Sequence, residues 1–134
     1  MVAYSFERRF VEPILIGLEP GPSKPGAKRQ TVRAERRSRH ARVGERMQLY
    51  FAMRTKQCRF LGEPRCVGVS PITLRFVPEP VVSIEGLPAP ADLDAFARGE
   101  GFARGWHELQ EFWAEFHARS AATQFNGVLL RWFP

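Results

Sequence analysis

A lysine and a threonine three positions apart, Lys28 and Thr31, are the residues of this chain that best fit nucleophilic catalysis. A threonine hydroxyl becomes a useful nucleophile when a base removes its proton, and a neutral lysine can be that base. Burial and neighbouring cations both lower the pKa of a lysine, and Arg29 and Arg33 flank the pair. In an ideal strand Lys28 and Thr31 would point to opposite faces, so a bulge or turn is required for the two side chains to meet.

A third candidate is Glu100, which lies between Gly99 and Gly101. The backbone freedom of the two glycines would allow the carboxylate to turn inward. Facing a basic cluster, it would balance charge or act as a general acid. The alternatives are a glutamate on a surface loop and a cap for the following helix, and spacing alone favours these alternatives.

Charge is strongly segregated along the sequence. Between Lys24 and Arg59 there are twelve lysines and arginines against two acids, a net charge of +10, whereas residues 79–118 carry eight acids and two arginines, a net charge of −6. Such segregation is typical of a protein with one surface that faces a polyanion, usually through its phosphate groups. The alternative is a solvated basic loop that packs against the acidic helix of the same molecule.

The composition predicts one domain over residues 1–134. At 44% hydrophobic and 12% aromatic residues, the chain can fill one core, which excludes an intrinsically disordered protein. No apolar run approaches the roughly 18 residues of a membrane span and no signal peptide is visible, so we expect a cytoplasmic protein without membrane contact. Cys58 and Cys66 lack metal-site spacing and the three histidines are scattered, so we expect reduced cysteines, no metal and no cofactor.

Hydrophobic periodicity predicts helices over residues 7–17 and 92–98, and a longer helix from residue 102 onward. The longer helix carries large apolar residues at helical spacing: Phe102, Trp106, Leu109, Phe112, Trp113 and Phe116. Such a stripe is typical of a helix that packs on the core, and we favour this reading over a surface on which bases stack.

Alternating and β-branched residues predict strands over residues 4–6, 28–33, 46–53, 57–61, 66–69, 72–77, 81–84 and 128–133. Two exposed loops are expected, a Pro- and Gly-rich one at 18–27 and a charged one at 34–43. Strands wrapped by two or three helices in a chain of this length predict an α+β domain built on a small β-barrel.

An ordered set of motifs along the chain resembles the activating signal cointegrator homology (ASCH) domain. The motifs are Arg9-Phe10, Ile14-Leu15-x-Gly17, Lys28-Arg29-Gln30-Thr31-Val32-Arg33, Val43-Gly44-Glu45-x-Met47-x-Leu49, Glu100-Gly101-Phe102, Trp106 with Phe112-Trp113, and Gly127-Val128-Leu129-Leu130-Arg131-Trp132. Each motif alone is weak, but their order covers nearly the whole chain.

The ASCH family is similar to the PUA domains, so the resemblance implies a small PUA-like β-barrel with helices packed around a cleft. The family's general role is RNA binding. One bacterial branch consists of amidohydrolases that remove the acetyl group from N4-acetylcytidine. Carried over by motif, its catalytic set falls on Lys28, Thr31 and Glu100, and Arg33 matches the arginine that follows the threonine. Other members are ribonucleases, so the fold alone does not fix the chemistry.

The chain departs from the hydrolase branch at two places. The Pro- and Gly-rich segment 18–27 is an insertion between Gly17 and Lys28, and Arg29-Gln30 replaces small or apolar residues. Three functions therefore stay open. The first is an RNA- or nucleotide-binding module with Lys28, Arg29, Arg33 and Arg54 as phosphate or base contacts. The second is an amidohydrolase of an acylated cytidine or a related small amide. The third is a metal-dependent ribonuclease, for which the sequence offers no obvious divalent-metal site.

Overall fold

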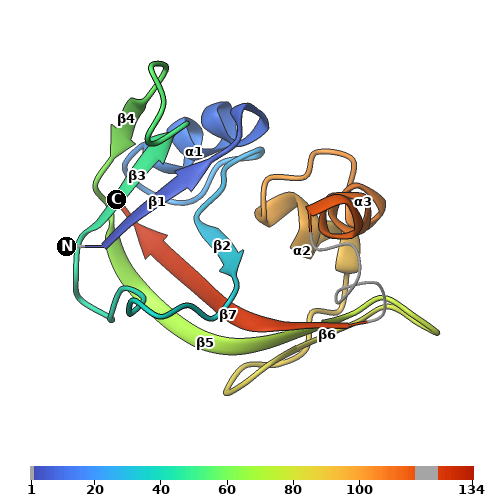
Figure 1. The fold of residues 1–134 in the computed structure, drawn as a ribbon. Coiled ribbons are helices and arrows are strands. Elements are labelled where there is room, and N and C mark those ends of the chain that lie inside the picture. Colours follow the sequence, from blue (N-terminus) through green and yellow to red (C-terminus); the bar gives the residue numbers. More distant parts are fainter. Residues whose placement is uncertain (1, 117–123) are drawn as a thin grey trace.

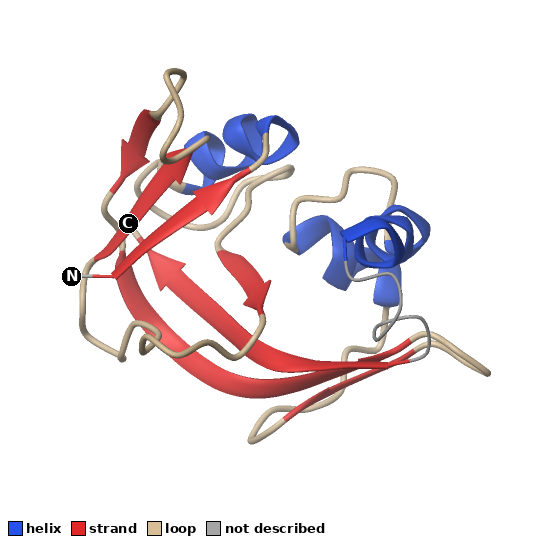
Figure 2. Cartoon of the chain, viewed as in Figure 1, coloured by secondary structure: helices blue, strands red, loops and turns tan. Residues whose placement is uncertain are grey.

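The structure of the protein is a computed structural model that describes residues 2–116 and 124–134. This part of the chain contains three α-helices, one short 3-10 helix and seven strands. The strands form two open sheets (Figures 1 and 2), and the described residues form no closed barrel. The predicted α+β class is confirmed. Where a β-barrel was predicted, the described strands form two open sheets.

The first sheet has the order β1-β3-β4. β1 (Val2–Phe6) pairs in parallel with β3 (Met47–Phe51), and β3 pairs antiparallel with β4 (Arg59–Gly62). A parallel pair needs a long connection, and here it contains the first helix and β2 (Gln30–Arg33). The chain therefore leaves the first sheet, passes through the candidate catalytic residues and returns to that sheet.

The second sheet is antiparallel and has the order β2-β7-β5-β6. Its two long strands, β5 (Arg65–Arg75) and β7 (Gln124–Phe133), curve beneath the molecule, and β6 (Val81–Ile84) lies at one edge. The first sheet lies at one end of this curve, and α2 and α3 lie at the other (Figure 1). β2 lies between these two groups.

The prediction of separate strands at 66–69 and 72–77 is wrong, because β5 runs without a break through Pro71. The carbonyl of Pro71 accepts a hydrogen bond from the backbone N–H of Glu85, just beyond the last residue of β6. In an antiparallel strand the nitrogen of a residue points to the same side as its carbonyl. The proline nitrogen therefore lies on the edge of β5 that faces β6, close to the point where the pairing with β6 ends. The opposite edge, which pairs with β7, loses no hydrogen bond.

The first two helices lie close to the predicted positions, whereas the helix predicted from residue 102 begins only at Trp106, so Phe102 belongs to the preceding turn. The 3-10 helix Arg8–Phe10 leads directly into α1 (Val11–Gly17), in which Pro13 is the third residue. Its missing N–H costs nothing there, because first-turn N–H groups have no acceptor within the helix. α2 (Leu93–Gly99) is capped by the side chain of Asp92, and α3 (Trp106–Phe116) follows after a short turn.

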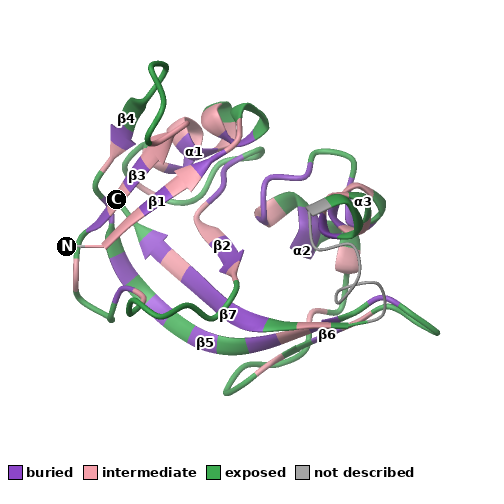
Figure 3. Cartoon of the chain, in the orientation of Figure 1, coloured by how far each residue is buried: buried purple, intermediate pink, exposed green. Residues whose placement is uncertain are grey.

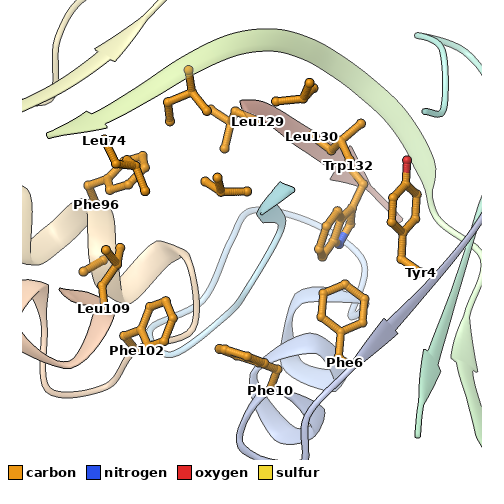
Figure 4. Packing of buried hydrophobic residues seen from close by; sticks show 14 of the residues in the cluster. Tyr4, Phe6, Phe10, Leu74, Phe96, Phe102, Leu109, Leu129, Leu130 and Trp132 are labelled. Atoms are coloured by element: carbon orange, nitrogen blue, oxygen red, sulfur yellow. The ribbon is translucent and has the colours of Figure 1, made fainter. Parts of the chain in front are cut away.

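The core packs aromatic side chains together with aliphatic ones (Figure 4). Figure 4 shows Phe6, Phe10 and Phe102 pointing into one interior region, and the ring centroids of Phe10 and Phe102 are 5.3 Å apart. Figure 3 shows buried residues concentrated where β7 passes under β2. Trp106 and Trp113 of α3 are buried, so the prediction that the aromatic stripe packs on the core is confirmed for them.

Other expectations are met in part. Segments 18–27 and 34–43 lack regular structure, and both cysteines are free thiols. None of the helices in the described ranges has the length and apolar character needed to cross a bilayer. The strand predicted over 28–33 begins only at Gln30, which matters for the site described below.

The C-terminus of α1 packs directly on the backbone of Lys28. The N–H of Lys28 donates to the carbonyl of Pro13 at 2.8 Å. A Cβ atom on Gly17 would lie 2.2 Å from the carbonyl oxygen of Lys28, far inside van der Waals contact. Gly17 therefore has to be a glycine for α1 to hold Lys28 in place.

Gly17→Ala should lower the free energy of unfolding by about 2–3 kcal/mol, because the backbone of Lys28 has to move. Gly99→Ala is the matched control, since Gly99 also ends a helix but its Cβ would meet its nearest atom, Nε2 of Gln30, at 3.7 Å. That change should stay within about 1 kcal/mol of the wild type. Chemical denaturation measures both, and an equal loss in the two variants would contradict the close packing of α1 on Lys28.

Candidate functional site

One cavity of about 340 Å³ brings the three candidate catalytic residues together. Lys28 and Thr31 reach it from the start of β2 and Glu100 from the end of α2, about 70 positions later in the chain. A volume near the lower end of the roughly 300–1,000 Å³ range of small-molecule pockets suits a ligand of the size of a nucleoside. The lining residues are Ser5, Phe6, Glu7, Phe10, Lys28, Thr31, Val32, Arg33, Ala34, Glu35, Arg36, His40, Glu100, Phe102, Phe112 and Trp113.

Lys28 is buried, with 1% of its surface exposed. Its ammonium group donates a hydrogen bond to the backbone carbonyl of Glu100 and lies 4.9 Å from the centroid of the Phe10 ring and 5.7 Å from that of Phe6. Burial lowers the pKa of Lys28 to about 8, although the charge of Glu100 opposes this shift. A lysine with this pKa has a substantial neutral fraction near neutral pH, which a general base requires.

Glu100 is also buried, with 3% of its surface exposed, so the surface-loop alternative is wrong. Its carboxylate accepts hydrogen bonds from Nε2 of Gln30 at 2.7 Å and from the backbone N–H of Val32 at 3.0 Å. Burial raises the pKa of Glu100, against the charge of Lys28 and these two hydrogen bonds. Nor does Glu100 cap α3, because the N–H of Trp106 donates to the carboxylate of Asp94.

Gly101 fixes the turn that places Glu100. Its φ of +99° lies in the left-handed region that favours glycine. A Cβ atom there would lie 2.6 Å from Cδ1 of Phe10 and 3.0 Å from Cδ of Lys28. The glycine thus lets the chain turn tightly against Lys28 and keeps the carbonyl of Glu100 on the ammonium group.

Thr31 is buried in β2 opposite Leu130 of β7 and lines the cavity. The alternation of an ideal strand does not separate it from Lys28, because Lys28 precedes the first residue of β2. Within the described ranges no hydrogen bond joins the Thr31 hydroxyl to Lys28 or Glu100. The three residues therefore share a cavity without the hydrogen bonds of an assembled triad, which in ligand-free sites often form only with substrate.

Arg33 is the one predicted nucleotide-binding arginine that lines the cavity. Its guanidinium donates to the carbonyl of Ser5 at 2.7 Å and lies over the rings of Phe6 and Tyr4, 4.6 and 5.3 Å from their centroids. Burial lowers the pKa of Arg33 to about 10, and the charge of Arg36 adds to this shift while Tyr4 opposes it. This arginine therefore points a partly desolvated charge at the ligand space.

The other two predicted arginines lie elsewhere. The guanidinium of Arg29 donates to the carbonyls of Gly17, Glu19 and Gly21 at 2.7–2.8 Å, so it fixes the start of the 18–27 loop. Arg54 is exposed in the turn after β3. Neither side chain lines the cavity.

Sequence reasoning missed three polar residues at the site. In the sequence, Gln30 is notable only as a departure from the ASCH hydrolase pattern, yet its side chain donates a hydrogen bond to the carboxylate of Glu100. Arg36 and His40 lie in segment 34–43, whose lack of periodicity gave no sign that it borders a cavity. The aromatic stripe gave a partial signal, since Phe102, Phe112 and Trp113 form part of the cavity wall.

The charge-segregated segments do not neutralise each other across the surface. Acids of α3 pair with Arg9, Arg104 and His107, all of which lie outside the basic segment 24–59. In the part of the chain that the structure describes, no salt bridge joins a cation of that segment to an acid of residues 79–116. The two segments meet instead at the buried contact of Lys28 with Glu100.

The free energy of unfolding should rise with pH in the window set by Lys28. Above a pH of about 8 the folded chain releases the Lys28 proton while the unfolded chain keeps it up to about 10.5, so the unfolded state binds more protons. From about pH 7.5 to about pH 9.5 the wild type should gain about 2 kcal/mol relative to Lys28→Met. Urea denaturation at the two pH values measures this gain, and parallel pH dependence of the two proteins would show that Lys28 has an ordinary pKa.

Comparisons with known proteins assign the chain to no family. No protein-family model, no curated protein and no solved structure matches it. Among the described residues, no group of three or more histidines, cysteines or acids is placed to hold a metal ion.

Proposed function

We propose that the cavity binds an N4-acylated cytidine and hydrolyses its amide, in a protein of the ASCH type with a PUA-like fold. The observation that carries the proposal is the convergence of buried Lys28, Thr31 and Glu100 on one cavity of nucleoside size. The resemblance assigns the same three positions to catalysis. A cytoplasmic location, where nucleosides and RNA are found, is part of the proposal.

The burial of both ionisable groups supports a functional role. Removing a lysine and a glutamate from water costs free energy, and a well-packed apolar pair of similar volume is often at least as stable. Here the two groups lie at a ligand-sized cavity, and burial shifts their pKa values toward each other. Such perturbed groups in a cavity are typical of catalytic sites.

The opposite pKa shifts suit an amide hydrolysis that begins with a neutral base and a neutral acid. Neutral Lys28 accepts the proton of the Thr31 hydroxyl, whose oxygen attacks the amide carbon of the substrate. The ammonium group that Lys28 becomes on taking this proton stabilises the negative charge that forms on the carbonyl oxygen. Protonated Glu100 then gives its proton to the departing N4 amine, which leaves the acyl group as an ester on Thr31.

Water completes the reaction by attacking this ester. Ionised Glu100 takes a proton from the water and the ammonium group of Lys28 gives its proton to the departing Thr31 oxygen, which releases the carboxylic acid and restores all three residues. A neutral lysine has two N–H donors and one lone pair. By donating to the carbonyl of Glu100, Lys28 keeps its lone pair for the Thr31 proton. The contact that buries Lys28 therefore also orients it as a base.

The apolar part of the cavity suits a nucleobase. Phe10, Phe102, Phe112 and Trp113 supply ring faces and edges along one wall. Aromatic side chains stack on bases at a gain of about 1–3 kcal/mol per base. The ammonium group of Lys28 lies over the Phe10 ring, so a base held against these rings would bring its exocyclic amide close to Lys28 and Thr31.

A non-catalytic RNA-binding module is the second candidate. It is favoured by the exposed arginines of segment 34–43, which border the cavity at Arg36. Binding through phosphates would weaken steeply with salt. Among the described residues, no feature favours a ribonuclease over these two functions.

Thr31→Val should abolish the release of acetate from N4-acetylcytidine, by on the order of 1,000-fold in kcat, because the variant keeps the side-chain shape but lacks the nucleophile. Thr31→Ser is the matched control and should keep measurable activity. Both variants should bind cytidine like the wild type, as measured by calorimetry. Full hydrolysis by Thr31→Val would remove Thr31 from the mechanism.

The rate should depend on the neutral form of Lys28. Because the mechanism needs neutral Lys28 and protonated Glu100 together, kcat/KM should follow a bell-shaped pH profile. It should fall about tenfold for each pH unit on the alkaline side, where both groups, including Lys28 with its pKa of about 8, have lost their protons. Lys28→Arg, which stays protonated, should be inactive over the whole range. A pH–rate profile of the wild type that is flat from about pH 6 to about pH 9 would contradict a base with this pKa.

A further inference from the structure

Two arginines lie together beside the Tyr4 ring at the cavity. The guanidinium carbons of Arg33 and Arg36 are 5.3 and 4.8 Å from the centroid of this ring, and both residues line the cavity. Tyr4 is itself held in place, because its hydroxyl bonds Nδ1 of His40 and the N–H of Ala41, each at 3.0 Å. The ring therefore gives both guanidinium groups a fixed surface.

Neither arginine has an acidic partner within the described residues. Arg33 donates to the carbonyl of Ser5, and Arg36 donates to the carbonyl of Arg39 at 3.3 Å. A guanidinium has five N–H donors, so most of those on both side chains remain for a ligand.

The acids that line the cavity are engaged elsewhere or stand apart. Glu7 pairs with Arg9 at 3.2 Å, and the carboxylate of Glu100 is held by Gln30 and Val32. Glu35 is exposed and makes no ion pair in the described part of the chain. Among the described residues no salt bridge therefore neutralises Arg33 or Arg36, although the charge of Glu100 acts on Arg33 without a direct contact.

Two adjacent cations without a counter-ion destabilise each other, and the lowered pKa of Arg33 reflects both its burial and the charge of Arg36. A phosphate monoester carries a charge of about −1.5 to −2 near neutral pH and presents three acceptor oxygens. Planar guanidinium groups match such oxygens with paired, charge-assisted hydrogen bonds. A single dianion would therefore satisfy both arginines.

We infer that the ligand of this cavity is a nucleoside monophosphate, whose phosphate is held by Arg33 and Arg36. The inference rests on the proposed function and narrows its substrate from a neutral nucleoside to a nucleotide. Arg36 is exposed whereas Lys28 and Glu100 are buried, so the phosphate lies toward the solvent and the base toward the catalytic residues. The cavity then has a cationic end, at Arg33 and Arg36, that holds the phosphate, and an apolar end that holds the base.

Calorimetric titration of cytidine and of cytidine 5′-monophosphate tests the inference, because neither compound carries an amide to hydrolyse. The wild type should bind the monophosphate at least about tenfold more tightly than cytidine, as expected for charge-assisted hydrogen bonds. Arg36→Gln and Arg33→Gln should each lose most of this preference and keep the affinity for cytidine. Arg37→Gln is the matched control, since Arg37 is exposed, adjacent in sequence and outside the cavity lining, and should keep the full preference.

Equal affinities for cytidine and its monophosphate in the wild type would overturn the inference and leave the proposed hydrolysis intact. The inference would also be overturned if both Arg36→Gln and Arg33→Gln, shown by circular dichroism to be folded, still bound the monophosphate more tightly than cytidine to the same degree as the wild type.

Two further ligands separate the remaining outcomes. If ribose 5-phosphate binds as tightly as the monophosphate and depends on Arg36, the phosphate site stands and recognition of the base fails. If a short cytidine oligonucleotide without a terminal phosphate binds more tightly than the monophosphate, and depends on Arg36, the phosphate comes from a strand and the mononucleotide is ruled out.

Discussion

The rest of the site depends on one buried contact, in which the ammonium group of Lys28 donates to the carbonyl of Glu100. Three segments that are far apart in the sequence are arranged around it. α1 holds the backbone of Lys28 through Pro13 and Gly17, β2 holds the carboxylate of Glu100 through the N–H of Val32, and the chain after α2 turns tightly against the lysine. A buried charge is tolerated only when its hydrogen bonds are made, so each of these segments has to be in place for the others to be stable.

Burial at the same contact shifts the pKa values of both groups. Because water is excluded, the charged forms of Lys28 and Glu100 are both disfavoured, and their pKa values shift in opposite directions. A core of apolar residues in their place would satisfy packing without this cost. The chain therefore retains a stability penalty where it also has a ligand-sized cavity, a combination that is typical of a site under functional selection.

The sequence predicted the parts of the fold that follow from local patterns. Periodicity and capping residues located α1, α2 and most strands, and the aromatic stripe of α3 was correctly assigned to the core. The continuous β5 was missed because the cost of Pro71 depends on where the neighbouring strand β6 ends. Whether Lys28 and Thr31 reach the same cavity was not predictable for a similar reason. It depends on the residue at which β2 begins, and tertiary hydrogen bonds determine that residue. The N–H of Lys28 bonds to α1, whereas the carbonyl of Arg29 already accepts from Trp132 of β7.

Arg29 and Arg33 show why charge in a sequence does not locate a binding site. Both belong to the segment of net charge +10, and both were natural candidates for phosphate contacts. Arg29 donates to three backbone carbonyls, that of Gly17 at the end of α1 and those of Glu19 and Gly21 in the 18–27 loop. Arg33 makes one such bond and lies over aromatic rings, so its remaining donors face the cavity. What distinguishes Arg29 from Arg33 is therefore the number of backbone acceptors that the fold places around each side chain, and this number is a property of the tertiary structure.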